Sequence, residues 1–405
     1  MNWKYVALGE LYEVHNGLSK GGKFFGKGSP FLSFSTVFNK WFLPQELLDL
    51  VQSTDNEQQS YSILRGDVFV TRTSETMDEL GMSSVALKDY PHATYNGFTK
   101  RLRPINPERI LPEFIGYYLR TPVFRAGFTA FSTMTTRASL RNEDLLSMKV
   151  PVPDMQTQKH IASILSAYDD LVENNQKQIK LLEEAAQRLY KEWFVDLRFP
   201  GHETTPIVDG IPEGWSMCTA GNVIEFNPKT PLKKGCIKQS VPMTALSTSS
   251  MVLNSSEFTM TESNSGAKFR NGDTLLARIT PCLENGKTAF VAGITSEEGA
   301  VGSTEFIVMR AKKINPYMVY LLTRTEEFRK TAINSMTGSD GRQRAQVDKI
   351  MQFPYLLAPQ STLEAFSQLV EPIFEQVYLK NSQIAQLSQA RDRLIPKLMN
   401  REIEV

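Results

Sequence analysis

The chain has 405 residues, and its 45 basic and 44 acidic side chains give a formal net charge of +1. This balance excludes a strongly basic nucleic-acid-binding protein and an acidic disordered tail at the level of the whole chain. The sequence contains no apolar run long enough for a membrane span, and its start lacks a signal-peptide pattern, so we expect a cytoplasmic protein without membrane contact. Isolated cysteines and scattered histidines predict no metal site.

The sequence repeats itself with a period of about 205 residues. The segment 64–72 (LRGDVFVTR) matches 270–278 (RNGDTLLAR) at an offset of 206, and Arg137 matches Arg342 at an offset of 205. From about residue 156 onward the offset stays at 205. Drifting offsets followed by a constant offset indicate variable loops in one part of each repeat and a rigid register in the other.

The rigid part of each repeat is predicted to be a long helix. Its mainly apolar positions alternate in steps of four and three for more than four heptads, which is typical of a coiled coil. Asn175 and Lys380 interrupt the two seams at equivalent positions and could fix the register. An amphipathic helix packed on a globular body is the alternative. The seam positions are Ile161, Leu165, Tyr168, Val172, Asn175, Ile179, Leu182, Ala186, Leu189 and Trp193 in the first copy, and Phe366, Val370, Ile373, Val377, Lys380, Ile384, Leu387, Arg391, Leu394 and Leu398 in the second.

Charge follows the same division. Residues 1–150 and 200–358 each carry 17 basic and 15 acidic side chains, whereas residues 151–199 carry 6 and 8, and residues 359–405 carry 5 and 6. Two slightly basic globular regions therefore alternate with two slightly acidic helices. Pro372 lies off the seam and is predicted to kink or break the second helix.

The globular regions are predicted to be mixed α/β. We expect short strands at 68–71, 274–277 and 303–310, and short helices at 113–120 and 317–324. The predicted fold class is α+β, with two similar mixed α/β domains separated by two long antiparallel coiled-coil helices in an internal pseudo-two-fold repeat. The predicted segments are a first domain at 1–154, a helix at 155–198, a linker at 199–214, a second domain at 215–358 and a helix at 359–405.

Connectivity predicts how the helices pair. The second helix begins where the second domain ends, so a pair must run antiparallel, with the domains at opposite ends. About 33 seam residues at 1.5 Å each give a stalk of roughly 50 Å, which corresponds to roughly 15 base pairs of duplex. Two similar but unequal domains at a fixed separation suit a split, non-palindromic DNA target, because pseudo-two-fold symmetry presents half-sites on opposite strands.

The junction between the repeats and the end of the chain carry a family resemblance. The segments are 150–153 (VPVP), 158–161 (QKHI), 183–194 (EEAAQRLYKEWF), 199–203 (FPGHE), 211–215 (IPEGW) and 393–398 (RLIPKL). They resemble the central region and the chain ending of HsdS, the specificity subunit of type I restriction–modification systems. The resemblance covers the whole chain as domain–helix–domain–helix.

This resemblance implies two target recognition domains that each read half of a bipartite DNA site. It also implies helices that act as a spacer and bind two methyltransferase (M) subunits, with restriction (R) subunits completing the nuclease. S-adenosylmethionine, ATP and Mg²⁺ would belong to those partners.

A glycine- and lysine-rich segment lies near the start of the chain. Residues 21–27 (GGKFFGK) fit the first seven positions of a phosphate-binding P-loop, but Gly28 replaces the required hydroxyl residue and Pro30 opposes the following helix. We interpret the segment as a flexible basic loop that follows a phosphate backbone, with a solvated surface loop as the alternative. Its candidate DNA-binding residues are Lys20, Lys23 and Lys27.

Arginines at repeated positions are the other DNA-binding candidates. Arg72 and Arg278 each close a strand, where they could contact a phosphate or a guanine edge or form an ion pair with Asp67 or Asp273. Two Ser/Thr-rich loops allow close approach to phosphates, although each loop could instead cap a helix. The candidates in these loops are Arg137 and Arg141 in the first repeat, and Arg342, Gln343 and Arg344 in the second.

We find no compact catalytic motif in the sequence. The adenine-methyltransferase motif, a glycine-rich cofactor fingerprint, a nuclease motif and a zinc-protease motif are all missing. We therefore expect a non-catalytic subunit without a cofactor or metal of its own. Two alternatives stay open: a coiled-coil adaptor that displays two protein-binding heads, and an enzyme in its own right.

Overall fold

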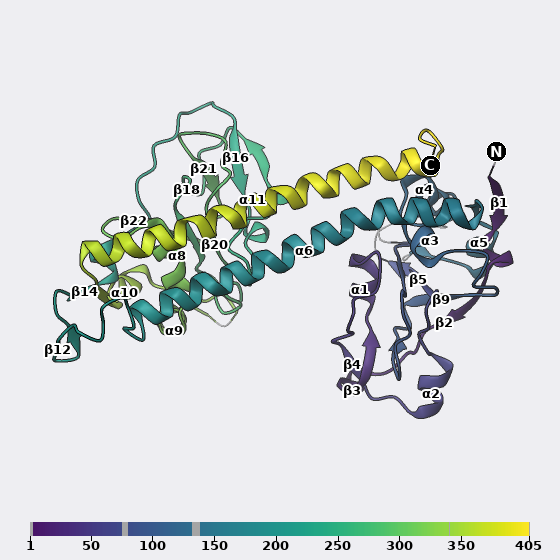
Figure 1. Cartoon of the computed structure of the whole chain (residues 1–405), viewed down its shortest axis with the longest axis horizontal. Coiled ribbons are helices and arrows are strands. Elements are labelled where there is room, and N and C mark those ends of the chain that lie inside the picture. Colours follow the sequence, from purple (N-terminus) through teal and green to yellow (C-terminus); the bar gives the residue numbers. More distant parts are fainter. Residues whose placement is uncertain (1–2, 75–79, 132–137, 340, 405) are drawn as a thin grey trace. The chain divides into compact units, whose positions relative to one another are not determined.

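A computed structural model describes residues 3–74, 80–131, 138–339 and 341–404. The chain forms two compact units. The first unit comprises residues 1–171 and 387–405, and the second unit comprises residues 172–386. Two helices of 40 residues each, α6 (Met155–Phe194) and α11 (Gln360–Met399), contribute a part to both units (Figure 1).

The first unit is built on two sheets. One is an antiparallel sheet of four strands in the order β2-β9-β5-β7, and the other has three strands in the order β4-β3-β8. Two further strand pairs, β1-β11 and β10-β6, tie separate segments together. The strands are β1 (Lys4–Ala7), β2 (Tyr12–Asn16), β3 (Phe25–Leu32), β4 (Leu50–Val51), β5 (Val68–Thr71), β6 (Thr73–Ser74), β7 (Ser83–Val85), β8 (Thr94–Tyr95), β9 (Thr99–Pro104), β10 (Ala138–Ser139) and β11 (Lys149–Val152).

The second unit repeats this plan. Its four-stranded antiparallel sheet has the order β15-β22-β19-β20, and its other sheet has the order β17-β16-β21-β18. The pair β14-β23 corresponds to β1-β11, and β12-β13 forms a hairpin in the linker. The strands are β12 (Ile207–Val208), β13 (Ile211–Pro212), β14 (Ser216–Thr219), β15 (Ile224–Phe226), β16 (Lys238–Val241), β17 (Thr259–Thr261), β18 (Ala267–Phe269), β19 (Thr274–Ala277), β20 (Thr288–Phe290), β21 (Ala300–Gly302), β22 (Phe306–Ala311) and β23 (Pro354–Leu357).

Strand direction confirms the internal repeat. Strand β3 pairs antiparallel with β4 and parallel with β8, and β16 pairs in the same way with β17 and β21. The predicted fold class is therefore confirmed: two similar α+β domains, each followed by a long helix. The units differ at β18, which adds a fourth strand to the second sheet of the second unit.

Several of the short helices also recur in both units. The helices predicted at 113–120 and 317–324 are α3 and α8, and both begin with a proline, which is favoured at the first helical position. The strand predicted at 303–310 begins later, at Phe306. The short helices are α1 (Phe34–Asn39), α2 (Asp55–Ser60), α3 (Pro112–Tyr118), α4 (Pro122–Phe131), α5 (Asn142–Ser147), α7 (Ala220–Val223), α8 (Pro316–Arg324), α9 (Glu326–Asn334) and α10 (Val347–Met351).

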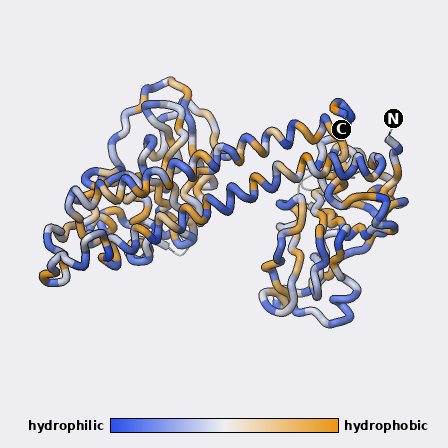
Figure 2. Tube along the Cα trace, viewed as in Figure 1, coloured by the Kyte–Doolittle hydropathy of each residue, from blue (hydrophilic) through white to orange (hydrophobic). Residues whose placement is uncertain are grey.

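An ion pair occupies the same place in the core of both units. The buried carboxylate of Asp67 accepts two bonds from Arg103, at 2.6 and 2.8 Å, and that of Asp273 accepts two from Arg310, both at 2.7 Å. Both carboxylates are buried, and hydrophobic stretches of the chain run through both units (Figure 2). Each carboxylate also accepts a backbone N–H three residues earlier in the chain. This pair holds the strand β5 or β19 against its neighbour.

The predicted break at Pro372 does not occur, because α11 is one continuous helix from Gln360 to Met399. Pro372 is exposed. The backbone hydrogen bond that its missing N–H removes therefore lies on the solvent side of the helix, where its loss costs little stability. Phe366, Val370, Phe374 and Val377 are buried on the packed face. Burying side chains of this size stabilises a protein by about 1.5–3 kcal/mol each, which outweighs the roughly 3 kcal/mol cost of an internal proline.

Contacts within each unit show that the two long helices run antiparallel. In the second unit, the rings of Trp193 and Phe194 near the end of α6 lie 5.6 and 4.9 Å from that of Phe366 near the start of α11. In the first unit, Asp169 in the earlier part of α6 forms an ion pair with Arg391 in the later part of α11.

Each globular part is anchored on its own portion of these helices. In the first unit the Tyr117 hydroxyl donates to the Asp169 carboxylate (2.6 Å), which also binds Arg391. In the second unit the buried Glu183 carboxylate accepts from the N–H of Met251 and the hydroxyl of Ser250, each at 2.8 Å, and burial raises the pKa of Glu183. Each anchor fixes one position of α6 against its domain.

Candidate nucleic-acid interface

Three segments that are far apart in the sequence meet at the same place in each unit. In the first unit the N–H of Arg72 donates to the Phe98 carbonyl, and the N–H of Leu140 donates to the Arg72 carbonyl, both at 3.0 Å. In the second unit Arg278 donates to the Glu305 carbonyl (2.9 Å), and Ala345 donates to the Arg278 carbonyl (2.8 Å). The repeat thus places the strand-end arginine beside the Ser/Thr-rich loop in both copies.

We call Arg72, Lys100 and Arg141 the first basic cluster. Lys100 is 5% exposed, and its ammonium group donates to the Asn142 side chain. Burial together with the nearby charge of Arg72 lowers the pKa of Lys100. The Arg72 guanidinium donates to Asn16 at 3.3 Å. Arg141 is exposed at the N-terminus of α5. Phe98, whose carbonyl accepts the N–H of Arg72, has an exposed side chain.

We call Arg278, Arg342 and Arg344, with Glu305 between two of them, the second basic cluster. Arg344 donates to the Glu305 carboxylate through Nε (2.9 Å) and Nη2 (2.6 Å), and Arg278 Nε lies 3.8 Å from it. The Arg344 guanidinium accordingly holds the pKa of Glu305 below its usual range. Nε and Nη2 of Arg344 are engaged by Glu305, so the donors on Nη1 are the ones that this carboxylate does not use.

The strand-end arginines Arg72 and Arg278 do not form the ion pairs with Asp67 and Asp273 that were the alternative to DNA contact. Asp67 and Asp273 bind Arg103 and Arg310 instead of Arg72 and Arg278. The partners lie on β9 and β22, next to β5 and β19 in the sheets, where they meet the carboxylates inside the core. The side chains of Arg72 and Arg278 are left for contacts elsewhere.

The lysine-rich segment differs from the flexible loop that we expected. Residues 22–24 form a single 3-10 turn, and Phe25 begins the eight-residue strand β3. The Lys20 ammonium donates to Glu57 (2.7 Å) and to the Gln52 carbonyl (2.6 Å), which uses much of its charge within the unit. Lys23 and Lys27 are exposed. Within the described part of the chain, no hydrogen bond or ion pair joins these three lysines to the first basic cluster.

Four of the five candidate residues in the two loops lie among the described residues. Arg137 lies outside the described residues. Arg342 is exposed and Gln343 is half-buried, and the Gln343 carbonyl accepts the N–H of Thr280 at 3.1 Å. Arg344 pairs with Thr337 through two backbone bonds of 2.9 and 3.1 Å, which join the two ends of the loop.

Sequence reasoning missed Lys100, Phe98 and Glu305. Lys100 lies in β9 between buried residues, where a lysine is unusual. A lysine within a predicted buried strand was therefore the signal that could have identified it. Phe98 and Glu305 occupy equivalent positions, each bonded through its carbonyl to a strand-end arginine. Only the backbone hydrogen bonds of the folded chain reveal that equivalence, because the offset between the two sequence repeats drifts in this region.

The described residues contain no group of three or more His, Cys, Asp or Glu side chains that could hold a metal ion. Within the same residues, no helix has the length and apolar character needed to cross a membrane.

Comparison with known protein families gives a match over residues 1–184 to the type I restriction modification DNA specificity domain. The type I restriction enzyme MjaIX specificity subunit of Methanocaldococcus jannaschii is 26% identical over 79% of this chain and 75% of its own length. The EcoAI specificity subunit of Escherichia coli is 32% identical over 40% of this chain and 28% of its own length.

The fold has a counterpart among solved structures. The S subunit of a type I restriction-modification system from M. genitalium superimposes with a TM-score of 0.55, covers 98% of this chain and 96% of its own, and is 14% identical. The domain–helix–domain–helix arrangement is therefore shared along nearly the whole chain.

Proposed function

We infer the function of this chain from its family, because it belongs to the specificity subunits of type I restriction–modification systems. Such a subunit is a non-catalytic component. We propose that its two domains each read one half of a bipartite, asymmetric DNA site. We further propose that the two long helices set the spacer between the half-sites and dock the methyltransferase subunits.

The observation that carries this proposal is the repeated basic cluster. The same structural position bears cations in both units, which supports a common polyanionic partner. The clusters nevertheless differ in chemistry: the first has the exposed Phe98 where the second has the Glu305 carboxylate. An aromatic side chain can contact a thymine methyl group, whereas arginine and carboxylate groups bind guanine and cytosine edges. Unequal chemistry at equivalent positions supports an asymmetric target.

Partners complete the proposed activity. We propose that two M subunits bring S-adenosylmethionine for adenine methylation, and that R subunits bring ATP- and Mg²⁺-dependent translocation and cleavage. The net charge of +2 on each globular region supports a division of labour in which partner subunits supply most of the phosphate neutralisation.

Charge reversal at Arg342 tests the DNA-reading role. We expect Arg342→Glu to weaken DNA binding by the assembled complex at least about tenfold, because an exposed cation near phosphates is replaced by an anion. Assembly with M subunits should survive, as measured by size-exclusion chromatography beside a gel-shift titration. Lys312→Glu, at an exposed position outside the cluster, is the matched control. Loss of assembly with Arg342→Glu would show that this residue is structural.

Substitution of Glu305 tests base reading by the second unit. In Glu305→Gln the neutral amide no longer holds the Arg344 guanidinium by two charge-assisted bonds. We expect discrimination at one position of the second half-site to fall by about 1–3 kcal/mol, or roughly 5- to 150-fold, with the first half-site unaffected. Competition binding with single-base variants of the target measures this. Glu298→Gln, which breaks a different ion pair of the unit, should leave the profile unchanged. An equal loss on every sequence would contradict a role in base reading.

A further inference from the structure

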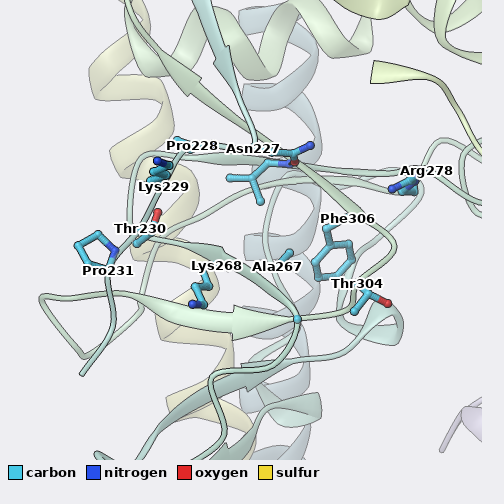
Figure 3. A pocket seen from close by; sticks show the side chains of 12 residues that line it. Asn227, Pro228, Lys229, Thr230, Pro231, Ala267, Lys268, Arg278, Thr304 and Phe306 are labelled. Atoms are coloured by element: carbon cyan, nitrogen blue, oxygen red, sulfur yellow. The ribbon is translucent and has the colours of Figure 1, made fainter. Parts of the chain in front are cut away.

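A cleft of about 760 Å³ opens in the second unit next to the second basic cluster. Its walls come from the loop after β15, from the start of β18, and from Arg278 at the end of β19 together with Thr304 and Phe306 (Figure 3). Arg278 therefore belongs both to this cleft and to the cluster that we propose contacts DNA. We call this feature the β18 cleft.

The charge of the β18 cleft is of one sign. Three cations line it, namely Lys229, Lys268 and Arg278, and its lining contains no acidic side chain. Figure 3 shows the two lysines toward one side of the cleft and Arg278 toward the other. Like charges held around one hollow repel each other, so an anion bound between them is favoured.

The Arg278 side chain points independently to an outside partner. Its Nε is buried and has no hydrogen-bond partner within the described part of the chain. Glu305, at 3.8 Å, lies beyond hydrogen-bond distance and already accepts three bonds from Arg344. A guanidinium with unused donors at the rim of a basic cleft matches the geometry of phosphate recognition.

The backbone holds the walls of the cleft in place. Gly266 has a φ of +98°, and a Cβ there would lie 2.0 Å from the Gly302 carbonyl oxygen, so only glycine fits. On the opposite wall, the Asn227 side chain accepts the N–H of Val308 at 3.0 Å, and the Thr230 hydroxyl accepts from Arg310 at 2.9 Å. These bonds form a shaped cleft beside β18, the strand without a counterpart in the corresponding sheet of the first unit.

We propose that the β18 cleft binds the sugar–phosphate backbone of the DNA that flanks the second half-site. The inference rests on the proposed function and adds a contact that is independent of base sequence. Lysines are point charges suited to phosphates, and Arg278 makes the cleft continuous with the second basic cluster. The consequence is an asymmetric footprint that extends farther beyond the second half-site than beyond the first.

The double variant Lys229→Ala/Lys268→Ala tests this contact in the full chain assembled with its methyltransferase subunits. We expect the slope of log Kobs against log salt concentration to become shallower by about 2, since each phosphate contact contributes about 0.9. Affinity should fall by a similar factor for cognate and unrelated duplexes, while the methylated sequence stays the same. Hydroxyl-radical footprinting should lose protection on the outer side of the second half-site only.

The control Lys312→Ala/Lys313→Ala removes the same charge from two exposed positions of the same unit outside the cleft lining, and it should keep the wild-type slope and footprint. If wild-type complex binds DNA but the cleft variant keeps its slope and footprint, the β18 cleft proposal is overturned while the proposed function stands. A loss confined to the cognate duplex would also overturn it, in favour of base reading. A wild-type complex that binds no DNA would defeat the proposed function itself.

Discussion

Removing the carboxylate of Asp273 is expected to destabilise the globular part of the second unit strongly. Asp273 is 1% exposed and accepts two bonds from the largely buried Arg310, as well as the N–H of Arg270 at 2.8 Å. Asp273→Ala leaves a guanidinium in the core without its counter-charge. Breaking a buried pair in this way costs about 3–5 kcal/mol, which is a large share of the roughly 5–15 kcal/mol that stabilises a typical protein.

Hydrogen exchange resolved by peptide measures this effect in each unit separately. Protection should be lost in β19 and β22 of Asp273→Ala, whereas β5 and β9 of the first unit keep theirs. The reciprocal change Asp67→Ala should reverse the pattern, because Asp67 binds Arg103 in the equivalent place. Glu262→Ala, at an exposed position of the second unit, serves as the control. A loss of stability below about 1 kcal/mol for Asp273→Ala would show that the pair is dispensable.

Local periodicity explains why the long helices and the repeat could be predicted from the sequence. A seam that recurs every seven residues is a property of neighbouring positions, and α6 and α11 cover both predicted seams in full. The strands at 68–71 and 274–277 were equally readable, since all their residues are apolar or small and all are buried. The seam contacts themselves, and the predicted segment boundaries, stay predictions.

Pairings across long sequence distances explain what could not be predicted. Asp67 directly precedes β5, and Arg103 lies on the neighbouring strand β9, but 36 positions separate the two residues in the chain. An arginine nearer in the sequence therefore looked equally suitable. The bond between Arg344 and Glu305 spans 39 positions. Pro372 was misjudged for a related reason: its effect depends on what the rest of α11 buries, which tertiary packing decides and local propensity does not.

Shortening the helices by one heptad is expected to shorten the spacer of the DNA target. The anchors at Asp169 and Glu183 fix each domain to its own part of α6, so residues 171–177 can be removed between them. A matching deletion of 382–388 lies between Tyr378, which donates to the Phe290 carbonyl at 2.7 Å, and Arg391. Removing seven residues keeps the phase of the seam. It also shortens each helix by about 10 Å, or about three base pairs of duplex.

Methylome sequencing of cells that carry the paired deletion measures the outcome. Both half-site sequences should persist, because the basic clusters and their core ion pairs are untouched, while the number of unspecified bases between them falls by about three. The length-preserving control Glu173→Ala/Lys177→Ala removes an exposed ion pair of the same segment and should leave the spacer as it is. Methylation at the original spacing in the deletion variant would show that α6 and α11 do not measure the distance. A changed half-site would instead indicate that helix length acts on base reading within a domain.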